Sequence, residues 1–148
     1  MPLNKTIERA RKDKKQGKSA STQAGEFVRE EIETIRKGVH GARSAKQAIA
    51  IGLSKARRAG VKLAPPKRGT TSEATRKKAV KDLKSAGSRK KPSAKRSRAT
   101  LKALKKESGA AASKKALSQQ ARTAARKRTP AQRSAAAKKA ARTRKAEK

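Results

Sequence analysis

Residues 22–37, TQAGEFVREEIETIRK, carry the strongest structural signal in the 148-residue sequence. Their apolar residues recur at intervals of three and four, which places them on one stripe of an α-helix. The stripe consists of Ala24, Phe27, Val28, Ile32, Ile35 and, just past the end, Val39. Gly38 follows as a helix stop. The pattern therefore predicts an amphipathic helix that needs a partner.

The partner is predicted at about residues 45–59, in the stretch SAKQAIAIGLSKARRAG. Ser44 and Gln47 form a capping-box pattern, in which the hydroxyl accepts from a free amide and the amide side chain reaches back. One face of this helix carries Ala45, Ala48, Ile49, Gly52, Leu53 and Ala56. We expect Ile32 and Leu53 to lie in the core, and Arg57 and Arg58 at the surface.

The end of the second helix is also marked. Gly60 occupies the position that favours a left-handed conformation, with Val61 placed to contact Ala56. The connection between the two helices is short, so they are expected to form an antiparallel hairpin. Pro65-Pro66 then ends regular structure.

Four weaker helices are predicted at 71–86, 94–107, 113–127 and 130–147. Thr70 with Glu73, and Thr129 with Pro130 and Gln132, resemble helix starts. These segments have good helix propensity but few large apolar side chains, and their like charges repel. We therefore expect them to be disordered alone and helical on a polyanion.

The predicted fold class is mostly α, with a short helical hairpin head and a long, basic, largely disordered but helix-prone C-terminal tail. Aromatic residues make up only 1% of the chain, too few for a core that orders its whole length. The expected parts are a basic arm at 1–21, the hairpin head at 22–64, a linker with a possible third helix at 65–87, and a low-complexity tail at 88–148.

The charge balance is extreme, with 45 Lys and Arg against 10 Asp and Glu and a formal net charge of +35. Such an excess destabilises a compact chain unless a polyanion neutralises it. Lys and Arg release counterions from phosphates, so we expect nucleic acid to be the partner. The predicted contacts are Lys46, Lys55, Arg57, Arg58, Lys77, Lys78, Arg89, Lys90, Lys91, Lys95, Arg96, Lys105, Lys106, Lys114, Lys115, Arg126, Lys127, Arg128, Lys138, Lys139, Arg142, Arg144 and Lys145.

The type of nucleic acid is indicated by what is missing. Single-strand and RNA binders stack bases on aromatic rings, and Phe27, the only aromatic residue, is expected in the core. Duplex DNA is therefore preferred, and RNA or the ribosome is the first alternative. A sequence-specific helix-turn-helix that reads bases with residues 45–59 is the second. Membranes are disfavoured because the tail offers mainly Ala as apolar surface.

Enzymatic chemistry has no candidate residues. Cysteine is absent, and His40 is the only histidine, so no metal site, cofactor or small-molecule substrate is expected. We interpret His40 as a turn residue. The acidic cluster Glu26–Glu33 is interpreted as helix support, for example through an Arg29–Glu33 pair, with an acidic docking patch as the alternative.

The block HGARSAKQAIAIGLSKARRAG at 40–60, with its flanking segments, resembles a family of small, basic bacterial proteins of unknown function. The tail resembles those of linker histones and bacterial histone-like proteins. The family resemblance implies a bacterial, cytoplasmic protein. Together with the charge, the two resemblances predict a histone-like, nucleoid-associated protein that compacts DNA without sequence preference; its oligomeric state is left open.

Overall fold

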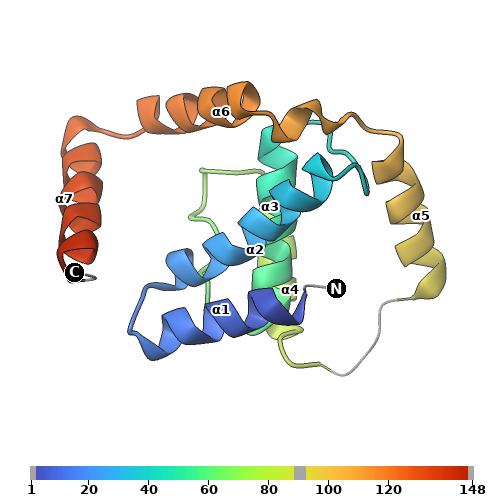
Figure 1. Ribbon diagram of the computed structural model, residues 1–148, viewed down its shortest axis with the longest axis horizontal. Helices are drawn as coiled ribbons and strands as arrows, with labels where there is room; N and C mark the ends of the chain where they lie inside the picture. The colour runs from blue at the N-terminus through green and yellow to red at the C-terminus, as the bar shows by residue number, and fades with distance from the viewer. Residues whose placement is uncertain (1–2, 89–92, 147–148) are drawn as a thin grey trace. The chain divides into compact units, whose positions relative to one another are not determined.

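The computed structural model describes residues 3–88 and 93–146, which fold into helices joined by turns and loops (Figure 1). The chain divides into two compact units, 1–113 and 114–148. The first contains α1 (Asn4–Lys15), α2 (Ala20–Arg36), α3 (Ala45–Arg58), α4 (Glu73–Lys84), α5 (Ala94–Lys105) and the 3-10 helix η1 (Gly109–Ala112). The second contains α6 (Lys114–Arg126) and α7 (Pro130–Ala146).

The prediction of a long disordered tail is wrong. The four weaker helices are present as α4, α5, α6 and α7, with bounds within about two residues of those predicted. Apart from Arg76, their Lys and Arg residues are exposed to solvent, where water screens the repulsion that was expected to unfold them. Local signals are then enough to form these helices. At the start of α7 the backbone amide of Gln132 donates to the Thr129 hydroxyl, and the backbone amide of Thr129 donates to the side-chain oxygen of Gln132.

The segment predicted as a basic arm at 1–21 contains α1, which packs against α2. Only Thr6 and Ala10 of α1 are buried, with Ile7 partly buried beside them. Charged residues surround these positions, so the apolar stripe is too narrow to stand out in the sequence. The head is therefore larger than a two-helix hairpin.

The core is built around Phe27, whose side chain is 1% exposed. The residues packed with it come from α1, α2, α3 and the loop after α3. They are Ala10, Ala24, Ala56 and Val61, with Ile7, Ala20, Leu53 and Leu63 partly buried around them. Ile32 is buried as predicted, whereas Leu53 is only partly buried. The small residues of α3 are the ones that meet α2 and close this core.

The crossing of α2 and α3 depends on Gly52. A Cβ atom at this position would lie 2.6 Å from Cα and 2.9 Å from the backbone nitrogen of Val28. The two backbones can approach this closely only because Gly52 has no side chain. Burial of Ala45, Ala48 and Ala56 along the same face extends the contact.

The ends of α3 follow the sequence signals. The Gln47 amide donates to the Ser44 hydroxyl at 3.2 Å, although the Gln47 side chain accepts from Arg43 rather than from Ser44. At the other end Gly60 adopts a φ of 96°, and the Val61 amide donates to the Ala56 carbonyl. This geometry is a Schellman motif, and it places Val61 in the core.

Two further segments attach to this centre. On α4, Ala79 is buried and Asp82 accepts a 2.6 Å hydrogen bond from the Ser54 hydroxyl of α3. The cap of α4 is Ser72, which accepts from the Thr75 amide, and not Thr70 as the sequence suggested. Ser72 is the residue directly before the first helical turn, so its hydroxyl reaches a free amide there.

The segment after α5 docks on the connection between α2 and α3. The Gly41 and Ala42 amides donate to the carbonyls of Leu104 and Ser108, and Arg36 Nε donates to the Ala112 carbonyl at 2.9 Å. Any side chain at Gly41 would overlap the Glu107 carbonyl. This docking holds the C-terminal end of α5, whereas none of the residues of α5 itself is buried.

Candidate nucleic-acid interface

Most acidic side chains of the first unit form ion pairs with basic side chains of the same unit. Eight of its nine Asp and Glu side chains form ion pairs with Lys or Arg of the same unit. The pairs are Arg9–Glu26, Lys18–Asp13, Arg29–Glu33, Arg43–Glu107, Lys55–Glu30, Lys55–Glu31, Arg58–Asp82 and Arg76–Glu73. The predicted Arg29–Glu33 support is confirmed.

Lys55 lies in a buried polar cluster between α2 and α3. Its Nζ is 2.6 Å from Glu31 Oε2 and 3.8 Å from Glu30 Oε1. The Glu31 side chain is fully buried, and its second oxygen lies 3.4 Å from His40 Nε2. Glu30 also accepts from the Leu3 amide. His40 is thus in the turn as predicted but has a carboxylate partner, and the cluster leaves the Lys55 charge neutralised inside the fold.

Arg57 is 7% exposed, so the prediction that it lies at the surface is wrong. Its guanidinium donates to the carbonyls of Leu63 and Ala64, both at 3.2 Å. Desolvation lowers the pKa of Arg57, and the nearby Asp82 carboxylate opposes this shift. The role of Arg57 is to hold the loop after α3, which the spacing of an Arg-Arg pair could not reveal.

The other two predicted contacts on α3 are accessible. Lys46 is exposed at the first turn. Arg58 is half exposed, and its Nε lies 3.8 Å from Asp82 Oδ1. The helix between them packs against α2, α4 and η1. It therefore occupies the middle of the first unit and does not project from it.

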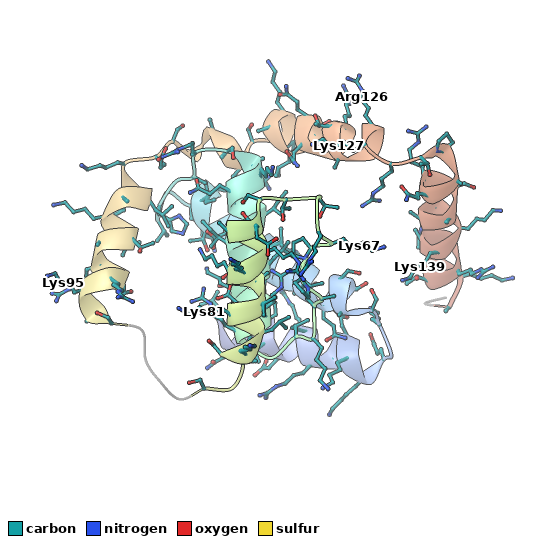
Figure 2. The ribbon with its side chains drawn as sticks, turned by 180° about the vertical axis from the view of Figure 1, so that it is seen from behind. Lys67, Lys81, Lys95, Arg126, Lys127 and Lys139 are labelled. Carbon is teal, nitrogen blue, oxygen red and sulfur yellow. The ribbon has the colours of Figure 1, made fainter. Side chains whose placement is uncertain are left out.

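The outer face of α4 is basic. Lys77, Lys81 and Lys84 are spaced by four and three residues, so they share one side of the helix, with Lys78 adjacent. All are exposed, and none of these four has an acidic partner in the described part of the chain. Figure 2 shows the Lys81 side chain extending away from its helix. The predicted set did not include Lys81 and Lys84, neither of which has a basic neighbour in the sequence.

The same spacing recurs on α5. Lys95, Arg98, Lys102 and Lys105 follow intervals of three, four and three residues, and all four are exposed. Arg98 and Lys102 were not predicted, although periodicity could have found them. The predicted Arg96 and Lys106 are exposed as well. Arg89, Lys90 and Lys91 lie outside the described residues.

The second unit is basic throughout. Its residues 114–146 include twelve Lys and Arg and no Asp or Glu. They are Lys114, Lys115, Arg122, Arg126, Lys127, Arg128, Arg133, Lys138, Lys139, Arg142, Arg144 and Lys145, and all of them are exposed. The labelled Arg126, Lys127 and Lys139 project from the helices or the turn between them (Figure 2). Ten of the twelve belong to the predicted set.

Metal-ligand groups and membrane-spanning helices are both absent from residues 3–88 and 93–146. No group of three or more His, Cys, Asp or Glu residues there could hold a metal ion. No helix among those residues combines the length and apolar character that crossing a bilayer requires. The described surface carries exposed Lys and Arg side chains, which on α4 and α5 are spaced three and four residues apart along one helix face.

The central segment of the chain matches a protein family. Residues 15–68 are similar to a family of unknown function, DUF6496. The matched segment covers α2, α3 and the loop that Arg57 holds. The chain is thus similar to an uncharacterised family over its central helices. Searches among curated proteins and among solved structures found no match.

Proposed function

We propose that the protein binds nucleic acid, with duplex DNA preferred, by neutralising the phosphate backbone without reading sequence. The observation that carries this proposal is the segregation of charge. Eight of the nine carboxylates of the first unit are paired internally, whereas the lysines of α4 and the cations of α5 and of the second unit are exposed without acidic partners in the described residues. Those cations are therefore available to an external polyanion.

The mechanism is counterion release. Each phosphate neutralised by Lys or Arg frees condensed cations. The logarithm of the DNA-binding constant therefore falls linearly with the logarithm of the salt concentration, with a slope of roughly −0.9 for each phosphate contact. Stripes at intervals of three and four residues allow one helix face to follow a phosphate chain. On α7 the cations surround the helix, so α7 can meet phosphate on more than one side. A chain that bridges separate DNA segments in this way compacts them.

Duplex DNA is favoured over the two alternatives by specific side chains. Phe27 is in the core, so the chain has no aromatic ring at the surface for stacking on single-stranded or looped bases. The helix-turn-helix alternative requires α3 to enter a groove. Lys55 and Arg57 of α3 are engaged internally, which leaves Lys46 and Arg58 as its accessible cations.

We further infer that the cellular target is chromosomal DNA of the bacterial nucleoid and that the protein is histone-like. The bacterial setting rests on the resemblance of residues 40–60, and compaction rests on the number of exposed cations. An RNA or ribosomal target remains the competing proposal, since rRNA offers the same phosphates.

The test is a salt series with the full chain on duplex DNA, structured RNA and anionic vesicles. Two charge-matched variants accompany it, each with six cations replaced by Gln, which keeps helix propensity high. One replaces Arg133, Lys138, Lys139, Arg142, Arg144 and Lys145 on α7, and the other Lys77, Lys78, Lys81, Lys84, Lys95 and Lys102 on α4 and α5.

We expect a steep slope on duplex DNA, little dependence on its sequence, and a shallower slope for both variants. Circular dichroism checks that their helix content is retained. If structured RNA binds more tightly than duplex DNA at every salt concentration, RNA is the preferred nucleic acid and the RNA alternative replaces the proposal. A wild-type slope near zero, or retention of the full slope by both variants, would refute phosphate binding by these helices.

A further inference from the structure

A cleft lies between α5 and the connection from α2 to α3. Its volume is about 670 Å³, within the range that holds a small ligand or a few side chains. The residues that matter for its chemistry are Ile35, Val39, His40, Leu101, Lys105 and Glu107. The bonds from Gly41 and Ala42 to the end of α5 fix one end of the cleft.

Two exposed apolar side chains meet at this cleft. Val39 is 53% exposed and Leu101 is 41% exposed, on opposite walls. Val39 was expected to extend the buried stripe of α2, but Gly38 turns the chain before it and leaves its side chain in solvent. With Leu3, these are the large hydrophobic residues exposed in the described part of the chain. Pairing them at one hollow favours an apolar ligand group.

The rim of the cleft is cationic. A second hollow of about 400 Å³ shares Leu101 and Lys105 with it and is lined further by Arg98, Lys102 and Lys106. The acid in the wall, Glu107, lies 3.7 Å from Arg43 and is already paired. An occupant therefore meets an apolar floor and a positive border.

We propose that this cleft binds an acidic polypeptide segment that inserts an aliphatic or aromatic anchor side chain between Val39 and Leu101. Charge complementarity selects this occupant: the carboxylates of the segment would meet Arg98, Lys102 and Lys105. A second copy of the chain carries the same net charge of +35 and would be repelled. Duplex DNA could reach the lysines but brings no flexible apolar side chain for the floor.

The probes are two twelve-residue peptides with the same eight Glu residues. One has a central Leu-Phe pair and the other has Ser-Gly in its place. Both are titrated into the full-length, ¹⁵N-labelled protein at physiological salt. We expect the anchored peptide to bind about tenfold more tightly, which corresponds to about 1.4 kcal/mol, because it buries a large apolar side chain that the other peptide lacks. The amides of residues 38–41 and 101–105 should shift most.

Three variants locate the effect. Leu101→Ser should remove the preference for the anchored peptide while leaving duplex DNA affinity unchanged. Leu3→Ser removes another exposed Leu, one that does not line the cleft, and should leave the preference intact. Arg98→Gln combined with Lys102→Gln should weaken both peptides by the same factor. DNA binding is measured in parallel, so the phosphate proposal and this one can fail separately.

Equal affinity for the two peptides, or shifts spread over the second unit, would overturn the proposal. Duplex DNA that shifts residues 38–41 and displaces the anchored peptide would assign the cleft to nucleic acid instead. Self-association of the wild-type chain that is lost in Leu101→Ser would assign it to a second copy.

Discussion

The two units use charged residues in opposite ways. In residues 1–113, carboxylates draw selected cations into the fold, as Lys55 and Glu31 show. In residues 114–146 there is no carboxylate, and every Lys and Arg is exposed. The difference shows that a run of basic residues cannot be interpreted by its composition alone. What decides its role is whether an acid elsewhere in the fold reaches it.

The stability of the two units should differ in the same way. The first unit buries Phe27 and Ile35, whereas α6 and α7 have no buried residue. Helices without tertiary contacts rest on propensity and caps, which contribute little. Substitutions in the first unit therefore test packing, and substitutions in the second test charge.

The largest effect is expected at the crossing of α2 and α3. Gly52→Leu places a side chain where Val28 backbone atoms lie within 3 Å, so α2 and α3 must separate and the first unit should unfold. The matched control is Gly25→Leu on α2, where nothing lies within 4 Å; it should stabilise by about 0.5–1 kcal/mol. Amide NMR spectra and thermal unfolding measure both. A folded first unit in Gly52→Leu would show that the helices do not cross here.

The next effect comes from the buried ion pair. Glu31→Met or Lys55→Met removes the 2.6 Å partner of a charge inside the fold and leaves only a longer contact, from Lys55 to Glu30 or from Glu31 to His40. Each should therefore destabilise the first unit, by up to about 3–5 kcal/mol. The double variant restores an apolar contact of similar volume and should recover much of the loss. Chemical denaturation of all four proteins gives the coupling energy. Additive losses would mean that the two side chains do not interact.

A smaller effect separates two neighbouring arginines. Arg57→Ala removes both hydrogen bonds to the loop carbonyls and should cost about 1–3 kcal/mol of stability. Arg58→Ala loses a half-exposed ion pair and should cost less than about 1 kcal/mol. Thermal unfolding of the two variants tests this difference. If the two variants are equally stable, then Arg57 does not hold the loop after α3, and the prediction from the sequence that it lies at the surface is the better one.

The helices were predictable because their signals are local. Ser44, Gly38 and Gly60 mark ends through backbone chemistry that depends on neighbouring residues alone. The buried cluster was not predictable, because Glu31, His40 and Lys55 meet only when two helices cross. The disordered tail was a wrong prediction for a related reason. The repulsion between Lys and Arg was judged from their spacing in the sequence, whereas on α7 the helix places these side chains on different sides, exposed to solvent.

The candidate interface shows the same division. Adjacent basic pairs identified most of the exposed cations in the second unit, where no acid competes. The prediction failed at Lys55 and Arg57 of the second helix, whose partners come from α2 and from the loop after α3. Adjacent pairs also missed Lys81 and Lys102, because helix faces are formed by residues three and four apart.

The smallest effect tests whether pairing decides a cation's role. Lys81→Gln and Lys139→Gln each remove an exposed cation, one from each unit, that has no acidic partner in the described residues. Each should reduce the salt slope on duplex DNA by about one and weaken binding alike on all sequences. Arg29→Gln removes a charge that is also exposed but lies 3.1 Å from the Glu33 carboxylate. Because Arg29 is already neutralised, its loss should change the slope by much less than one.

The free energy of unfolding of all three variants should lie within about 0.5 kcal/mol of that of the wild type, since each changes an exposed side chain. Their slopes can therefore be compared directly. If Arg29→Gln lowers the slope as much as Lys139→Gln does, then DNA responds to total charge and internal pairing is irrelevant to binding. If only Lys139→Gln lowers it, then binding is confined to the second unit, and the stripe on α4 serves another purpose.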